Sequence, residues 1–143
     1  LNAGQLQLSV DLDPGAFFAQ LNLGRLLARS GRLKEAERCY RAATEIAPKH
    51  PDGWYNRGLL KRRMGDMAAA LGFFEEARAL DPQDPEIALA LLYAASATGD
   101  RPRVLRVLSD ERWLESASSK QRAERDRLRD EAASSDAQGL GVR

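Results

Sequence analysis

The sequence has one cysteine, Cys39, and one histidine, His50, among its 143 residues. One residue of each type cannot build a disulfide framework or a zinc site. Long apolar runs are missing too, so we predict no membrane-spanning segment and no membrane partner. The scarcity of cysteine favours a reducing, cytoplasmic compartment. A periplasmic location stays open, because the chain begins at Leu1 without a methionine and an upstream signal would be invisible.

The sequence also lacks an excess of charge of either sign. It has 22 Lys and Arg residues against 21 Asp and Glu residues, which gives a net charge of +1. Such a chain has no overall field that would attract nucleic acid or an anionic membrane. Walker-type, dinucleotide-binding and nucleophile-elbow glycine patterns are absent. We therefore predict a chain that is not an enzyme, with no catalytic, cofactor-binding or metal-binding residue, no cofactor and no nucleic-acid partner.

What the sequence does contain is an internal repeat. Leu-Asp-Pro at residues 12–14 returns as Ile-Ala-Pro at 46–48 and as Leu-Asp-Pro at 80–82, a spacing of 34 residues both times. The same offset relates a set of small and aromatic residues: Gly24 to Gly58, Gly31 to Gly65 and Gly99, Ala36 to Ala70, Tyr40 to Phe74, and Ala43 to Ala77. Apolar residues between them recur at helical spacing. Each unit is predicted to hold two helices, the first ending at a glycine and the second near a proline.

These units carry most of the signature of a known repeat. Residues 51–84 contain Trp54, Gly58, the pair Ala70 and Phe74, and Pro82; residues 17–50 contain Leu23, Gly24, the pair Ala36 and Tyr40, and Pro48. The pattern resembles the tetratricopeptide repeat, which reads W-x2-L-G-x2-Y, then A-x3-F, then a closing proline. Arg57 and Lys61 depart from it, standing where leucine and tyrosine are usual. We expect both to lay their apolar stems over the interface with their charges in water.

The glycines and aromatic residues of this pattern have an expected packing role. A small residue at Gly24 or Gly58 should let the first helix of a unit approach the alanines of the second helix closely. Tyr40 and Phe74 should then fill the space between units, because large aromatic side chains bury much apolar surface.

The resemblance implies an all-α fold. We expect an α-solenoid of antiparallel helix pairs, forming a right-handed superhelix, with about three repeats and a C-terminal capping helix. The boundaries follow the period: residues 1–16 are the remnant of a preceding repeat (its second helix and turn), 17–50 the first repeat, 51–84 the second, 85–116 a degenerate third, 117–133 a charged C-terminal helix, and 134–143 a flexible tail.

In resembling proteins the first helix of each unit lines a concave face that binds partners. The matching positions here give the predicted partner-binding residues Arg25, Arg29, Tyr55, Asn56, Leu59, Arg62, Arg63 and Tyr93. Because guanidinium groups suit carboxylates, we expect an extended, acidic segment of a protein or peptide partner. The alternative is that these arginines only keep the groove solvated. The chaperone-tail clamp of some relatives is not predicted, since Leu21, Glu86 and Ala90 stand where it needs basic residues.

The sequence therefore predicts a non-catalytic protein–protein interaction module. An alternative is a substrate-docking segment of a larger enzyme, such as a glycosyltransferase or sulfotransferase. Self-association through exposed repeat ends stays open, because truncated repeat arrays often stack on one another. The excess of arginine over lysine points to a bacterial source.

Overall fold

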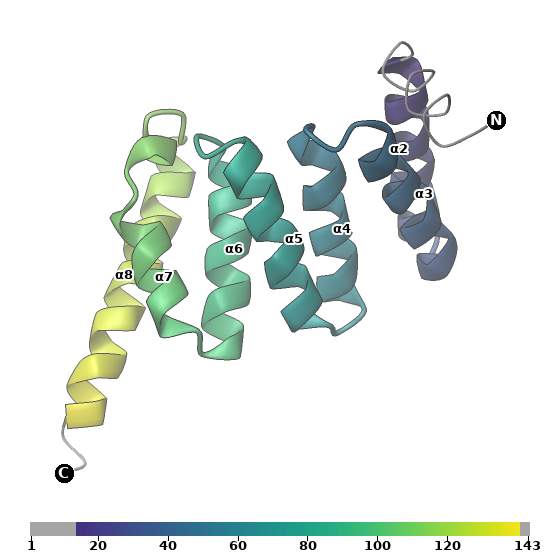
Figure 1. Cartoon of the computed structure of the whole chain (residues 1–143). Coiled ribbons are helices and arrows are strands. Elements are labelled where there is room, and N and C mark those ends of the chain that lie inside the picture. The colour runs from purple at the N-terminus through teal and green to yellow at the C-terminus, as the bar shows by residue number, and fades with distance from the viewer. Residues whose placement is uncertain (1–13, 141–143) are drawn as a thin grey trace. The chain divides into compact units, whose positions relative to one another are not determined.

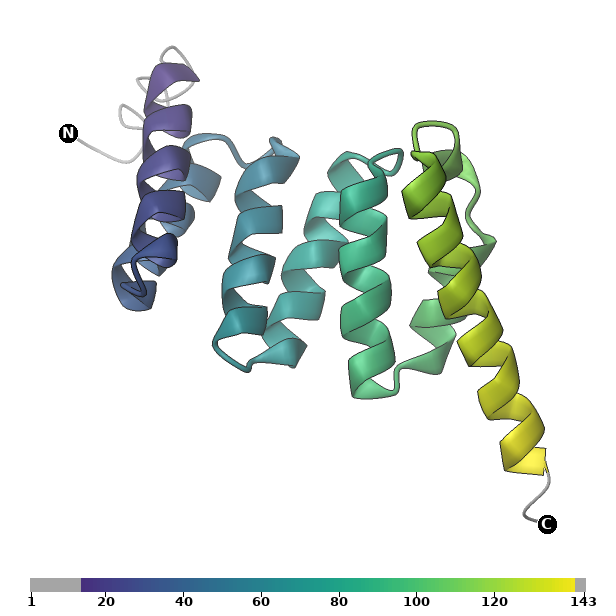
Figure 2. The same cartoon turned by 180° about the vertical axis from the view of Figure 1, so that it is seen from behind.

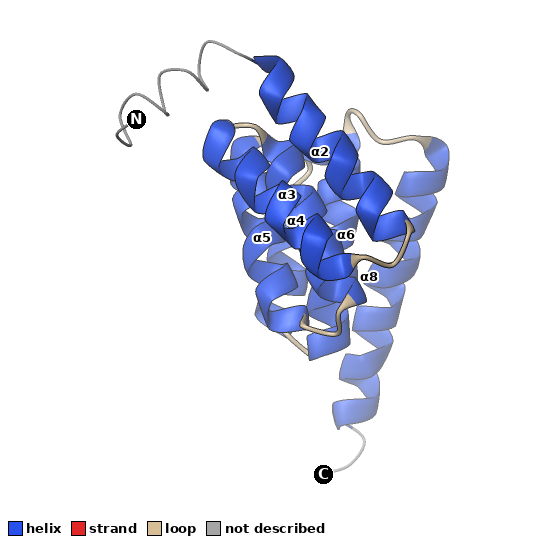
Figure 3. Ribbon diagram, turned by 90° about the vertical axis from the view of Figure 1, so that its right-hand side faces the viewer, coloured by secondary structure: helices blue, strands red, loops and turns tan. Residues whose placement is uncertain are grey.

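The computed structural model describes residues 14–140, and these residues form helices and connecting turns without a strand (Figures 1 and 3). The α-helices are α2 (Pro14–Arg29), α3 (Leu33–Ile46), α4 (Pro51–Arg63), α5 (Met67–Leu80), α6 (Pro85–Thr98), α7 (Arg101–Ser109) and α8 (Ser119–Leu140), with a short 3-10 helix η1 (Arg112–Leu114) before α8. The predicted all-α class is confirmed. The predicted remnant at 1–16 lies outside the described residues except for 14–16, which open α2.

The helices group into two compact units, one ending at Asp81 and the other beginning at Pro82. The N-terminal unit contains α2 to α5, and the C-terminal unit contains α6, α7, η1 and α8. In the N-terminal unit α2 pairs with α3 and α4 pairs with α5, as the 34-residue period predicts.

The turns inside the helix pairs are built in the same way each time. Gly31 and Gly65 have φ values of 82° and 85°, in the left-handed region that favours glycine. Gly99 takes the same conformation after α6. The next helix then begins immediately, and the carboxylate of Asp66 caps α5 by accepting from the Ala69 N–H at 3.1 Å. Local sequence chemistry thus fixes where each first helix stops.

The start of α4 has an unusual cap. His50 Nδ1 accepts a hydrogen bond from the Asp52 N–H at 3.2 Å, and Pro51 takes the first helical position. The His50 ring also lies against Phe17, with centroids 4.4 Å apart. His50 is therefore a structural turn residue, which closes the connection between α3 and α4.

The core of the N-terminal unit shows what two of its helical glycines, Gly24 and Gly58, do. A Cβ atom at Gly24 would lie 2.5 Å from Cε1 of Tyr40, and one at Gly58 would lie 2.5 Å from Cδ1 and Cε1 of Phe74. Both distances are too short for real atoms, so each glycine makes room for an aromatic ring of its own unit. The predicted close approach of the alanines is accompanied by this contact of each ring with the glycine of its own repeat, which was not predicted.

The C-terminal unit is organised around Trp113, whose side chain is fully buried and whose Nε1 donates to the Val107 carbonyl at 3.3 Å. Leu128 is the apolar anchor of α8 and is 5% exposed. Arginines on α8 bind carbonyls that end the preceding elements: Arg122 Nη2 lies 2.8 Å from the Leu114 oxygen, and Arg125 Nη2 lies 3.3 Å from the Leu108 oxygen. The capping role predicted for this helix agrees with these contacts. Figure 2 shows the course of α8, in yellow, from behind.

Helix α8 keeps the repeat period, although its composition does not suggest this. Its first residue, Ser119, follows Pro85 of α6 by the same 34 residues that separate Pro85 from Pro51 of α4. The helix is longer than predicted, because it continues to Leu140 where the sequence analysis places a flexible tail from residue 134. Arg101 on α7 contributes to this extension by pairing with Asp136. The expected tail is therefore helical as far as residue 140.

Candidate functional site

A cavity of about 350 Å³ opens on the N-terminal unit where α2, α3 and α4 meet. We call it the arginine pocket; its lining residues are Arg25, Ala28, Arg29, Tyr40, Asn56, Leu59, Leu60 and Arg63. Five of the eight predicted partner-binding residues line it: Arg25, Arg29, Asn56, Leu59 and Arg63. No Asp or Glu side chain belongs to the lining, so three positive charges gather around one opening.

Helical spacing explains how these side chains meet. Arg25 and Arg29 are four residues apart on α2, one turn of helix, and so share a face. On α4, Asn56, Leu59 and Arg63 follow one another at spacings of three and four and share a face in the same way. Because α2 and α4 contact each other, these two faces form the opposite walls of the arginine pocket.

Hydrogen bonds across the arginine pocket use neutral acceptors. Arg25 Nε lies 3.4 Å from Asn56 Oδ1, and Arg63 Nη1 donates to the Ala28 carbonyl. Asn56 is buried and held in turn by its Nδ2, which donates to the Asp52 carbonyl at 2.7 Å. These bonds orient two guanidinium groups without neutralising them. Arg29 has no hydrogen bond or ion pair within the described part of the chain.

The other predicted site residues lie outside the arginine pocket. Arg62 is exposed on α4 and makes no hydrogen bond or ion pair to any residue that the structure describes. Tyr55 packs on α5, with its ring centroid 6.0 Å from that of Phe74. Tyr93 belongs to the C-terminal unit, where its hydroxyl donates to the Glu124 carboxylate. The structure therefore brings five of the predicted residues together and gives Tyr55 and Tyr93 partners of their own.

Three residues of the arginine pocket were not predicted as binding residues, namely Ala28, Leu60 and Tyr40, and Tyr40 is the one with a polar side chain. Its side chain is 3% exposed and was expected only to fill space between units. The 34-residue match to Phe74 hid the difference, because tyrosine and phenylalanine are equivalent in packing but not in hydrogen bonding. The signal that could have found it is the hydroxyl group in one unit where the other unit has none.

Arg57 was expected to keep its charge in water, but its guanidinium group lies against other side chains. Its guanidinium carbon lies 4.2 Å from the centroid of the Phe73 ring and 5.4 Å from that of Trp54. Its Nη1 also lies 3.1 Å from Thr44 Oγ1 on α3. Burial lowers the pKa of Arg57, although the guanidinium stays charged at any physiological pH. The residue is a packing element between α3, α4 and α5.

Lys61 was also expected to keep its charge in water, and it too has a partner within the fold. Its Nζ lies 2.7 Å from Glu37 Oε1 on α3, and this hydrogen bond holds the pKa of Glu37 below its ordinary value. Two of the basic residues between Trp54 and Asp66 are therefore occupied within the fold. The basic residues of α4 that remain for a partner are Arg62 and Arg63.

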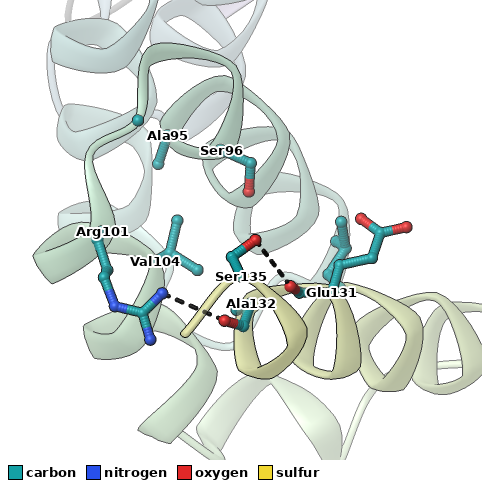
Figure 4. A pocket seen from close by; sticks show the side chains of 9 residues that line it. Ala95, Ser96, Arg101, Val104, Glu131, Ala132 and Ser135 are labelled. Carbon is teal, nitrogen blue, oxygen red and sulfur yellow. Dashed lines mark hydrogen bonds between the residues drawn. The ribbon is translucent and has the colours of Figure 1, made fainter. Parts of the chain in front are cut away.

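A second cavity, of about 400 Å³, lies in the C-terminal unit between α6, α7 and α8 (Figure 4). Val104 and Ala95 give it an apolar wall. Two of its polar groups are engaged within the fold: Arg101 Nη1 donates to the Ala132 carbonyl at 3.2 Å, and the Ser135 hydroxyl donates to the Glu131 carbonyl at 3.1 Å. This cavity was not predicted from the sequence, and its arginine serves to attach α8.

Between residues 14 and 140, no cluster of three or more His, Cys, Asp or Glu side chains could hold a metal ion. None of the helices in that range has the combined length and apolar character needed to cross a bilayer. Cys39 is half-buried and free.

Comparison with known proteins places this geometry in a family. The sequence model described as "Tetratricopeptide repeat" matches residues 10–85. "Cellulose synthase 1 operon protein C" of Komagataeibacter xylinus is 33% identical over 100 residues, which are 70% of this chain. The chain spans only 7% of the length of that relative.

Two solved structures illustrate the likeness of the fold. The "First TPR of Spaghetti (RPAP3) bound to HSP90 peptide SRMEEVD" has a TM-score of 0.70 and 20% identity, over 85% of this chain and 96% of that one. The Thermobaculum terrenum O-GlcNAc transferase (mutant K341M) has a TM-score of 0.62 and 27% identity, over 72% of this chain and 19% of that one.

Repeats of this type are in general non-catalytic modules for protein interaction. The 34-residue period, the helix pairs and the aromatic rings seated on helical glycines all agree with the matched sequence model. The chain belongs to the tetratricopeptide repeat family.

Proposed function

We propose that the N-terminal unit binds an extended, acidic segment of a protein partner on the face formed by α2 and α4. The contact residues are those predicted from the sequence within this unit: Arg25, Arg29, Tyr55, Asn56, Leu59, Arg62 and Arg63. The observation that carries the proposal is the arginine pocket, where three guanidinium groups line one opening with no acidic side chain.

The charge arrangement supports an acidic partner. Arg29 and Arg62 have no ion-pair partner within residues 14–140, and Arg25 and Arg63 bind only neutral oxygens. Bringing a carboxylate to this face relieves repulsion among the arginines and adds charge-assisted hydrogen bonds. Leu59, which is half-buried in the pocket lining, offers an apolar contact for the partner's backbone or side chains.

The related Spaghetti domain is bound to an HSP90 peptide with the sequence SRMEEVD, which is acidic. That likeness supports an acidic peptide as the general kind of partner. It does not extend to the same peptide, because Leu21, Glu86 and Ala90 occupy the places where the chaperone-tail clamp has basic residues. The proposed contacts come instead from the arginine pocket and from Tyr55 and Arg62 on α4, which also contributes lining residues to the pocket.

The test uses defined peptides. An array of extended peptides of equal length, in which glutamate, glutamine and lysine replace one another, is probed with the purified chain. We expect binding to glutamate-rich peptides that weakens with added salt. The double variant Arg29→Glu, Arg62→Glu should lose this binding while keeping its helical circular dichroism.

The matched control is Lys34→Glu with Arg38→Glu on α3. Both residues are exposed and make no recorded interaction with another described residue, so this variant has the same change in net charge. It should bind the glutamate peptides like the wild type. Equal loss in the two double variants, or equal binding to glutamate and glutamine peptides, would contradict the proposal.

A second candidate function is a docking segment for the substrate of a larger enzyme, such as a glycosyltransferase or sulfotransferase. The likeness to part of an O-GlcNAc transferase, at 27% identity, favours it. The complete open reading frame decides this case: a catalytic domain in the same frame supports it, and a frame with repeats alone refutes it.

A further inference from the structure

We propose that the arginine pocket holds one oxyanion group of the bound segment, a carboxylate or a phosphoryl group, and that the Tyr40 hydroxyl is a hydrogen-bond donor to it. This inference rests on the proposed function and assigns a specific ligand chemistry to one place on the binding face. Tyr40, Arg25, Arg29 and Arg63 are the residues that carry it.

The first observation is the state of the Tyr40 hydroxyl. The side chain is 3% exposed, yet its hydroxyl has no hydrogen bond to any residue between 14 and 140. Buried hydroxyl groups are almost always bonded. The Tyr40 hydroxyl oxygen is not sealed from solvent, since it is not among the buried side-chain atoms that lack a hydrogen-bond partner. Since Tyr40 lines the arginine pocket, this pocket is the opening through which its hydroxyl can reach a ligand.

The second observation is that the ring is fixed in place. The Tyr40 ring covers Gly24, where an added Cβ atom would lie only 2.5 Å from Cε1. The ring therefore cannot move closer to α2, and the close packing around it limits other movement. A donor held in one position costs little conformational entropy when a ligand arrives.

The third observation concerns charge. Burial raises the pKa of Tyr40, while the nearby Arg25 guanidinium opposes that rise. The phenol thus stays protonated at neutral pH and offers an O–H donor, where a phenolate would repel an anion. The effect of Arg25 on this pKa also indicates that its charge lies near the hydroxyl.

The remaining donors of the pocket complete the site. Asn56 is held on both sides, because one of its Nδ2 hydrogens is donated to the Asp52 carbonyl and its Oδ1 accepts from Arg25. It positions Arg25. Arg29 keeps all of its N–H groups available, and Arg25 and Arg63 each use only some of theirs. Three guanidinium groups and one neutral hydroxyl suit an oxyanion, which accepts several hydrogen bonds at once.

The experiment uses inorganic phosphate and acetate as probes, with sodium chloride at equal ionic strength as the reference. The Nε–Hε signals of the arginines are followed by NMR in the full chain. We expect those of Arg25, Arg29 and Arg63 to shift with one common, saturable dependence on the probe. Arg38, which is exposed on α3, should follow ionic strength only.

The decisive variant is Tyr40→Phe, which keeps the ring on Gly24 and removes only the hydroxyl. We expect it to weaken binding of the probe by about tenfold, the effect of one hydrogen bond to a charged group. Arg29→Gln, at an exposed position, should weaken binding without touching the core. Saturation with phosphate alone identifies a phosphoryl ligand, and saturation with acetate alone or with both probes identifies a carboxylate or a general oxyanion. All of these results support the site.

Two outcomes overturn the inference. One is a set of linear shifts that match those in chloride or those of Arg38. The other is saturable binding that is unchanged in Tyr40→Phe, which would show that the arginines bind the anion without a hydrogen bond from the Tyr40 hydroxyl. The proposed function would still stand after either outcome, provided that glutamate peptides bind and that their binding depends on Arg29 and Arg62. Loss of peptide binding in the array would instead refute both.

Discussion

The ammonium group of Lys61 lies 2.7 Å from Oε1 of Glu37, and this ion pair joins α4 to α3 across the boundary between two repeat units. Each side chain is only 20% exposed, so water screens the pair less than it would at an open surface. Lysine at this place departs from the tetratricopeptide pattern, and its acidic partner lies on the preceding unit. The pair therefore joins the first repeat to the second through a contact that the family signature does not contain.

Removing the carboxylate of this pair should produce a stability difference that depends on pH. The pKa of Glu37 is lowered in the folded chain, mainly by the hydrogen bond from Lys61. A lowered folded-state pKa stabilises the fold above the ordinary carboxyl pKa and loses this effect as the pH falls through the folded-state value. Glu37→Gln should reduce the free energy of unfolding by about 0.5–1 kcal/mol at neutral pH.

Urea unfolding at neutral pH and at about pH 3 checks this, because wild type and variant should converge in acid. Glu76→Gln is the control, since Glu76 is exposed and without a recorded partner in the described residues. A difference that stays constant over this pH range would show that the pair contributes nothing through its charge.

Alanine should act in opposite directions at two helical glycines. At Gly24 a Cβ atom would meet the Tyr40 ring at 2.5 Å, whereas at Gly72 of α5 nothing lies within 4 Å. Gly72→Ala should raise stability by about 0.5–1 kcal/mol through helix propensity. Gly24→Ala should lower it by about 1–3 kcal/mol, because overpacking outweighs the same propensity gain. Thermal melts followed by circular dichroism measure both, and equal signs would contradict the close approach.

Arg57 should resist replacement by lysine. Its planar guanidinium lies on the Phe73 ring and donates to Thr44 Oγ1. We expect Arg57→Ala to destabilise the N-terminal unit by about 1–2 kcal/mol. Arg57→Lys should recover less than half of this, since an ammonium group cannot stack and donate in the same geometry. Chemical denaturation of the three proteins decides it, and full recovery by lysine would mean that charge alone matters.

Helix α8 should depend on one apolar anchor. Leu128→Ala should cost the C-terminal unit about 2–4 kcal/mol, because Leu128 is 5% exposed. Leu105→Ala on α7 is the matched control, with a side chain that is 47% exposed, and should cost well under 1 kcal/mol. Hydrogen exchange resolved by peptide should show faster exchange in α6 to α8 for the first variant, with α2 to α5 unchanged. Equal protection in both variants would refute the anchoring role.

Periodicity alone was sufficient to predict the helix pairs and their turns. The positive φ angles of Gly31 and Gly65, and α5 and α6 starting beside Asp66 and Pro85, follow from local chemistry that a sequence displays. The end of α8 was harder, because salt bridges such as the one between Arg101 and Asp136 join residues far apart in the sequence. Such pairings become visible only when two helices are placed side by side.

The candidate site was predictable as a face and less so as a set of contacts. The repeat register placed Arg25, Arg29, Asn56, Leu59 and Arg63 correctly on one surface, because a register fixes which side of a helix a residue occupies. It could not show that Tyr40 reaches the same cavity from α3, or that Arg57 leaves solvent for the Phe73 ring. Those outcomes depend on side-chain rotamers and on neighbours from other helices.

Because the 34-residue period continues into α8, the residues of its N-terminal half can be matched to residues of α2 and α4. Asp126 stands at the place in α8 that Gly24 occupies in α2 and Gly58 in α4. In those helices the missing side chain leaves a seat for the aromatic ring of the following helix. A helix docking on α8 in the same manner would press its ring onto a carboxylate that already pairs with Arg129. Because α6 carries the buried, apolar Leu92 at the same place and still packs against α7, it is the charge of Asp126, and not the mere presence of a side chain, that distinguishes α8 from the other first helices.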